Sequence, residues 1–255
     1  MIQVHNLTQS YSRNGHKKTL KNIDLSIREQ AVTALIGANG AGKSTLLGVM
    51  SNLLPALSGS VTLHGKDIRH IKPSDLARHI AVLKQTHHTG IRLTVQDLVE
   101  FGRFPHCGGR PGETDLAKIH EALLYMELEE LRHRYLDELS GGQRQRAFIA
   151  MILAQDTPYI FLDEPLNNLD IKYSVEMMKI IRRLVEELHK TIIIVLHDIN
   201  FASAYADHIV AMKDGCILRE GPPATMMTKE VVDHIYEHDF NIAQVEGKSV
   251  CLYFN

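Results

Sequence analysis

The sequence contains few cysteines, and their number and spacing favour no covalent framework. Cys107, Cys216 and Cys251 are the three cysteines of the 255-residue chain. They are odd in number and far apart, so they match neither the paired pattern of a disulfide scaffold nor the close spacing of a zinc site. We therefore expect reduced thiols in a cytosolic protein.

A surplus of charge and a long apolar run are also missing. The chain has 28 Lys and Arg against 30 Asp and Glu, a net charge of −2, which argues against nucleic-acid binding driven by bulk positive charge. Its longest apolar run is AFIAMILA, residues 147–154, far short of the roughly 20 residues of a membrane-spanning helix. The start, MIQVHNLTQSYS, lacks the basic and apolar parts of a signal peptide. We expect a globular protein with no membrane span.

Histidine, in contrast, is abundant, and a metal site must be considered. His87 adjoins His88, and His234 and His238 are one helical turn apart, among fifteen histidines in all. Neither pair has a third or fourth ligand at a convincing spacing. Solvated or helix-capping histidines are therefore the preferred interpretation.

Three segments combine an unbroken apolar run with a polar end. They are VTALIGANG (32–40), YIFLDEP (159–165) and TIIIVLHD (191–198). Such runs are typical of parallel strands covered by helices on both faces. Since ligands of open α/β sheets bind beyond the carboxyl ends of the strands, we expect the three polar ends to meet at one site.

Other periodicities surround these strands. Alternation in IQVHNL and in SVTLHGKDI predicts antiparallel strands near the N-terminus, and Asp214-Gly215 predicts a hairpin turn. Helical spacing predicts helices over 115–134 and 173–190, with Leu116, Ile119, Leu123 and Met126 as core positions of the first. After residue 228 we expect one helix and a short hairpin, to which no chemistry is assigned.

The nonapeptide GANGAGKST matches the phosphate-binding pattern G-x4-G-K-[ST] in full. Its glycines allow backbone amides to surround phosphates, its lysine can reach the β- and γ-phosphates, and its serine hydroxyl can bind Mg²⁺. An apolar strand precedes it and a helix follows, as this function requires. The predicted ATP-binding residues are Gly37, Ala38, Asn39, Gly40, Ala41, Gly42, Lys43, Ser44 and Thr45.

A second half of a nucleotide site is predicted at FLDEP. Asp163 ends an apolar strand and suits coordination of Mg²⁺, directly or through water. Glu164 follows, where it could polarise an attacking water. Two adjacent carboxylates repel each other, and a bound Mg²⁺ relieves that repulsion, which argues against a purely structural role.

The segment LSGGQ precedes a second helix, and with it the chain resembles an ATP-binding-cassette (ABC) ATPase. The matching elements follow the family order over nearly the whole length: GANGAGKST, Gln85 in IAVLKQ, LSGGQ, YIFLDEP, NNLD and His197 in VLHD. Tyr11 stands where the family has an aromatic residue that stacks on adenine, although it could equally be a packed strand residue.

The resemblance implies a fold and a division of the chain. The fold class is α/β, a RecA-like P-loop NTPase core with a mostly parallel sheet, an N-terminal antiparallel β subdomain and an inserted α-helical subdomain. The single ABC domain, 1–255, would have its core at about 1–86 and 155–225 and its helical insert at about 87–154. The C-terminal helix and hairpin would occupy about 226–255.

It also implies a mechanism that uses ATP and Mg²⁺. Cassettes of this family form head-to-tail homodimers, in which the signature loop of one copy covers the ATP of the other. That loop is here Leu139, Ser140, Gly141, Gly142 and Gln143. Mg²⁺ would be held by Ser44, Gln85 and Asp163, and the catalytic residues would be Glu164, His197, Lys43 and Gln85. Asp170 would act in communication across the dimer, although Leu166-Asn167-Asn168 replaces the commoner Thr-Ser-Ala.

The stretch TVQDLVEFGRFPH (94–106) is similar to importers of iron chelates, haem and cobalamin. This likeness implies a motor for uptake of a ferric siderophore, peripheral on the cytoplasmic face of the membrane, with separate permease subunits and an external binding protein. The alternatives are a haem or cobalamin importer and a soluble ATPase of iron–sulfur cluster assembly. A small-molecule P-loop kinase is disfavoured because LSGGQ has no role there.

Overall fold

The structure is a computed structural model that describes residues 1–11, 18–84, 92–167 and 169–253. Within those ranges, no helix has both the length and the apolar character needed to cross a membrane. The chain divides into two compact units. Unit 1 comprises Met1–Ile71 and Ile181–Asn255, and unit 2 comprises Lys72–Ile180. The division into core, insert and tail expected from the sequence stays a prediction.

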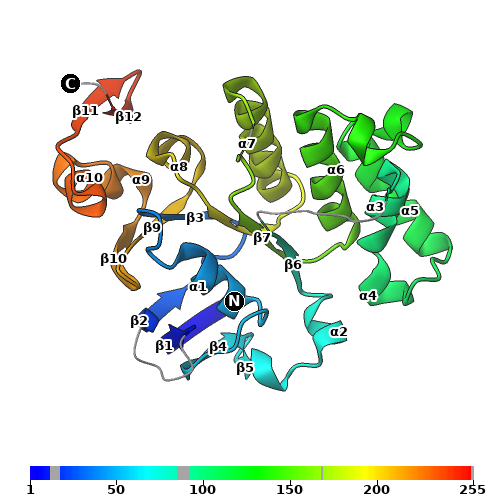
Figure 1. The fold of residues 1–255 in the computed structure, drawn as a ribbon, viewed down its shortest axis with the longest axis horizontal. Helices are drawn as coiled ribbons and strands as arrows, with labels where there is room; N and C mark the ends of the chain where they lie inside the picture. Colours follow the sequence, from blue (N-terminus) through cyan, green and yellow to red (C-terminus); the bar gives the residue numbers. More distant parts are fainter. Residues whose placement is uncertain (12–17, 85–91, 168, 254–255) are drawn as a thin grey trace. The chain divides into compact units, whose positions relative to one another are not determined.

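Unit 1 begins with an antiparallel sheet of order β2-β1-β4-β5 (Figure 1). Its strands are β1 (Ile2–Ser10), β2 (Lys18–Ser26), β4 (Ser58–Leu63) and β5 (Lys66–Asp67), followed by the short helix η1 (Ile68–His70). Ile2 and Val4 of β1 are buried on one face, as successive residues of a strand point to opposite faces, whereas Leu7, Thr8 and Gln9 are buried in succession where the pairing register shifts. The predicted N-terminal antiparallel strands are confirmed.

The second sheet of unit 1 has the fully buried strand β3 (Val32–Ile36) at its centre. It pairs in parallel with β8 (Thr191–Val195) and with β9 (His208–Lys213), and β10 (Cys216–Gly221) adds an antiparallel edge. Residues of β3 and β8 are buried on both faces, as their unbroken apolar runs predict. The predicted hairpin at Asp214-Gly215 is also confirmed.

Helices and a terminal hairpin complete unit 1. The helices are α1 (Lys43–Met50), α8 (Ile199–Tyr205), α9 (Pro223–Met226) and α10 (Lys229–Tyr236). The hairpin is the antiparallel pair β11 (Asn241–Val245) and β12 (Lys248–Leu252), and this pair is drawn in red in Figure 1. The helix and hairpin predicted after residue 228 are therefore present.

Unit 2 combines a parallel strand pair with a group of helices. The strands are β6 (Ile80–Leu83) and β7 (Tyr159–Asp163). The helices are α2 (Pro73–Leu76), α3 (Val95–Phe101), α4 (Phe104–Cys107), α5 (Glu113–Tyr125), η2 (Glu129–Leu131), η3 (Leu136–Glu138) and α6 (Gly141–Ala154). Helix α7 (Ile171–Glu186) begins in unit 2 and ends in unit 1. Helices α3, α5 and α6 pack on one another, drawn in green in Figure 1.

Two details of the first predicted helix are wrong. Helix α5 ends at Tyr125 because the chain reverses at Glu127, which has a φ of 55°. This turn is closed by a backbone hydrogen bond from Leu128 to Leu123, and it buries Leu128 completely. Leu116, expected in the core, is 48% exposed, whereas Ile119, Leu123 and Met126 are buried as expected.

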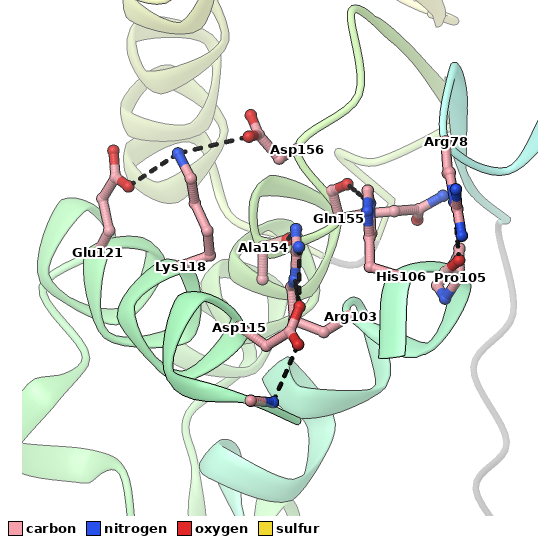
Figure 2. A network of polar contacts seen from close by, with 11 residues as sticks. Arg78, Arg103, Pro105, His106, Asp115, Lys118, Glu121, Ala154, Gln155 and Asp156 are labelled. Carbon is pink, nitrogen blue, oxygen red and sulfur yellow. Dashed lines mark hydrogen bonds and ion pairs between the residues drawn. The ribbon is translucent and has the colours of Figure 1, made fainter. Parts of the chain in front are cut away.

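A buried ion pair ties the helices of unit 2 together, as Figure 2 shows. The Arg103 guanidinium lies 2.9 Å from the Asp115 carboxylate and donates a 2.8 Å hydrogen bond to the carbonyl of Ala154, at the end of α6. Hydrogen bonds from the Gly112 backbone and from Arg103 lower the pKa of Asp115. The stabilisation from this carboxylate is therefore present above its unfolded pKa and is lost as the pH falls through the lower folded value.

We predict that Arg103→Met lowers the free energy of unfolding by about 3 kcal/mol, because it leaves the Asp115 carboxylate buried without its partner charge. Denaturant unfolding followed by circular dichroism measures the change. Arg92→Met is the matched control, since Arg92 pairs with Asp137 at the surface, where such pairs contribute about 0–1 kcal/mol. Equal effects of the two substitutions would contradict this account of Arg103.

Candidate active site

The loop between β3 and α1 brings the predicted phosphate-binding residues together in unit 1. A Cβ atom on Gly37 would lie 2.1 Å from the Met212 carbonyl oxygen, and the φ of Gly37 is 139°. Only glycine fits this close approach. The backbone N–H of Gly215 then donates to the carbonyl of Ala41, which ties the β9–β10 turn to the same loop. Within the loop, Ala38, Asn39 and Gly40 are exposed.

Helix α1 presents its N-terminus at the end of this loop. Gly42 occupies the N-cap with a φ of 102°, no side chain caps the helix, and its first turn contains no acidic residue. Uncapped amides and the helix dipole favour an anion at this position. The Lys43 ammonium donates hydrogen bonds to the carbonyls of Gly37 and Ala38 at 2.8 and 3.1 Å. It therefore lies within the predicted phosphate-binding loop.

Two further residues of unit 1 lie at this loop or at the same edge of the sheet. The Tyr11 hydroxyl is 3.2 Å from the Thr45 hydroxyl, while 64% of the Tyr11 residue is exposed. His197 follows β8, and since Leu35 pairs with Val195, Gly37 and His197 both lie two residues beyond that pair. His197 is exposed at this edge.

In unit 2, the predicted carboxylates follow the buried strand β7. Asp163 ends the strand and is half-buried. Glu164 has a φ of 53°, an uncommon conformation for a residue with a side chain, and such backbone strain is enriched at functional sites. The Asn167 side chain donates a hydrogen bond to the Glu164 carboxylate. Gln85, which the sequence places beyond β6, lies outside the described residues.

The signature segment forms the N-terminus of α6. The Ser140 hydroxyl accepts from the Gln143 N–H at 3.3 Å, and the Gln143 side chain accepts from the Ser140 N–H at 3.0 Å, a reciprocal capping box. A Cβ on Gly142 would lie 2.7 Å from the Tyr173 ring, whereas a Cβ on Gly141 would meet nothing within 4 Å. Leu139 precedes this cap and is half-buried.

Asp170 lies immediately before α7. Its carboxylate accepts from the Tyr173 N–H at 3.0 Å, and its carbonyl accepts from the Ser174 N–H. Asp170 and the signature segment are thus linked through Tyr173, whose backbone N–H donates to the Asp170 carboxylate and whose ring packs against Gly142. No periodicity or motif of the sequence indicates this role of Tyr173.

Comparison with known proteins decides the family. The model of the ABC transporter family matches residues 20–167, which is more than half of the chain. The chain belongs to the ABC transporter family. It is an ATPase of that family, as the resemblance implies.

Relatives match this ABC ATPase over nearly its whole length. It is 51% identical to the petrobactin import ATP-binding protein YclP of Bacillus subtilis (strain 168), with 100% of both chains covered. It is 37% identical to the iron(3+)-hydroxamate import ATP-binding protein FhuC of the same organism, over 94% of this chain and 91% of the relative. The dimeric structure of MJ0796, a bacterial ABC transporter cassette, is 32% identical, with a TM-score of 0.76 over 88% of this chain and 99% of that one. The predicted P-loop NTPase fold is confirmed.

The contact between Gly142 and Tyr173 gives a matched pair of substitutions. We predict that Gly142→Ala destabilises the ABC ATPase by about 1–3 kcal/mol, because the added methyl overlaps the ring. Gly141→Ala, the control, has open space for its methyl and should leave stability unchanged within about 0.5 kcal/mol. Thermal unfolding compares them.

Combining Gly142→Ala with Tyr173→Ala tests whether overlap with the Tyr173 ring causes the loss of stability. If the ring is the obstacle, the double variant loses less stability than the two single losses added together. Strict additivity would show that Tyr173 does not determine the need for glycine.

Proposed function

We propose that this chain is the ATP-hydrolysing subunit of an importer of ferric siderophores. The observation that supports it most directly is 51% identity, over the full length of both chains, to a protein named for petrobactin import. A second relative is named for iron(3+)-hydroxamate import. In this proposal two copies clamp ATP at the cytoplasmic face of the membrane, separate subunits form the permease, and an external protein delivers the iron chelate.

The loop from Gly37 to Thr45 binds the phosphates of ATP in this proposal. The uncapped N-terminus of α1 and the buried Lys43 ammonium attract the β- and γ-phosphates. During hydrolysis these groups stabilise the charge that develops on the phosphate oxygens, which supplies most of the acceleration in phosphoryl transfer. Tyr11, beside Thr45, offers its exposed ring to adenine.

The oxygen donors of the two motifs suit magnesium. Ser44 has an exposed position in the first turn of α1, and Asp163 has a carboxylate at the end of β7. Hydroxyl and carboxylate oxygens are the hard ligands that Mg²⁺ prefers. We assign these two residues, with Gln85, as its ligands. When bound, Mg²⁺ would neutralise charge on the phosphates.

Glu164 orients or deprotonates the attacking water. The hydrogen bond from Asn167 fixes its carboxylate, and the strained backbone sets its direction. His197, at the end of β8, contacts the γ-phosphate and maintains the geometry of attack. A carboxylate oriented by a neighbouring amide has further acceptor orbitals that can be directed at the water.

The dimer completes the site. The exposed Gly141 leaves the first turn of α6 open to a phosphate of ATP on the partner copy. The dimeric structure of a 32% identical cassette supports this arrangement. ATP between two copies then stabilises the dimer, hydrolysis weakens it, and Asp170 transmits the change. The resulting cycle of closing and opening drives the permease.

We predict that Glu164→Gln lowers the rate of ATP hydrolysis by about 100-fold or more, since amide nitrogen cannot serve as general base. ATP affinity should remain within about threefold of wild type, and ATP should cause the variant to accumulate as a dimer. Phosphate release and size-exclusion chromatography with light scattering measure the two effects. Glu176→Gln, an exposed residue of α7, is the control. Wild-type turnover by Glu164→Gln would remove Glu164 from the mechanism.

The cargo is tested by iron uptake in cells. In a strain lacking this chain, wild type should restore uptake of ⁵⁵Fe bound to petrobactin, and Glu164→Gln should not. The wild-type chain should also co-purify with permease subunits from detergent-solubilised membranes. Restored uptake of haem or cobalamin in place of siderophore, or co-purification with a soluble iron–sulfur scaffold, would contradict the assigned cargo while leaving the ATPase mechanism intact.

A further inference from the structure

The C-terminal hairpin contacts the segment that carries His197. The Asn200 side chain makes two hydrogen bonds with the backbone of Cys251: it donates to the carbonyl at 3.0 Å and accepts from the N–H at 2.8 Å. The Ser203 hydroxyl donates to the carbonyl of Ser249 at 3.2 Å. Two positions of α8 are therefore joined to the backbone of β12.

A third contact reaches the residue next to His197. The Tyr253 hydroxyl donates a 2.7 Å hydrogen bond to Oδ1 of Asp198, and the same oxygen accepts from the N–H of Asn200 at 2.7 Å, capping α8. Burial, then the hydrogen bond to Asp198 and its charge, raise the pKa of Tyr253, so the phenol remains protonated and able to donate at neutral pH.

Aromatic packing holds Tyr253 in this position. Its ring meets Phe240 edge to face at 6.3 Å, and Phe240 meets Tyr236 of α10 in the same manner at 6.0 Å. These three residues, with His197, Asp198 and Cys251, line a cavity of about 280 Å³. Burial raises the pKa of Tyr236, whose hydroxyl has no hydrogen-bond partner among the described residues. The same aromatic cluster thus borders His197 and Asp198.

We propose that Tyr253 is a positioning residue for ATP hydrolysis, and that the C-terminal hairpin fixes the 197–200 segment through Asp198 and Asn200. The proposal rests on the role proposed above for His197. On its N-terminal side His197 is fixed by β8, where Leu196 donates to the carbonyl of Leu35. On its C-terminal side it is fixed by the Asp198 cap, and Tyr253 determines the direction of that carboxylate. The backbone that carries the exposed His197 side chain is therefore fixed on both sides.

Tyr253→Phe tests the proposal, because it keeps the ring and removes the hydroxyl. We expect kcat for ATP hydrolysis to fall about tenfold, the change that corresponds to one hydrogen bond to a charged group. KM for ATP should stay within about twofold, since binding by the Gly37–Thr45 loop is retained. Gln244→Ala is the matched control: it removes a 2.8 Å hydrogen bond to Ser249 within the same hairpin and should leave kcat unchanged. Equal melting temperatures for the two variants show that the hairpin remains folded.

A double-mutant cycle with His197→Ala decides whether Tyr253 acts through the histidine. In the His197→Ala background we expect Tyr253→Phe to cause no further loss of kcat. A further tenfold loss there would show an independent effect and overturn the proposal. Wild-type kcat for Tyr253→Phe, together with a kcat of His197→Ala that is lowered about tenfold or more but still measurable, would also overturn it while leaving the proposed function intact. Wild-type turnover by His197→Ala would instead overturn the role of His197 itself.

Discussion

The close approach of two backbones, at Gly37 and Met212, is the constraint on which the unit 1 site depends. The 2.1 Å separation that a Cβ would have from the Met212 carbonyl leaves no room for any side chain at this position. Strand β3 lies between β8 and β9, and the chain passes Gly37 directly after leaving it. The loop that follows holds the Lys43 ammonium against the carbonyl of Gly37 and exposes Ala38, Asn39 and Gly40.

In unit 2, a glycine likewise permits a close contact, at the N-terminus of α6. Gly142 permits the Tyr173 ring to lie against the first turn of α6, and the Tyr173 N–H in turn donates to the Asp170 carboxylate. A glycine therefore determines the packing in each of the two segments that carry a glycine motif. In both cases a pattern that predicts phosphate binding also has a packing role.

The fold and the motif positions could be predicted because they depend on local order in the sequence. Unbroken apolar runs predicted β3, β7 and β8, and alternation predicted β1 and β4. The end of α5 could not be predicted, since Glu127 adopts a positive φ that its residue type does not favour, and burial of Leu128 stabilises the turn. Likewise, the hydrogen bond from Asn167 to Glu164 depends on the strained turn after β7, which no periodicity specifies.

Contacts between segments that are distant in the sequence could not be predicted from it. Tyr253 and Asp198 are 55 residues apart, and although Asp198 ends the motif segment TIIIVLHD, Tyr253 belongs to no motif. The sequence pattern of the tail indicates only one helix and one hairpin, so it predicts no chemistry there. In the structure that hairpin is joined to α8 by two hydrogen bonds between the Asn200 side chain and the backbone of Cys251, which do not depend on the side chains of β12. Packing that works through the backbone leaves little trace in residue types, so a segment can support a catalytic residue while its own sequence carries no motif.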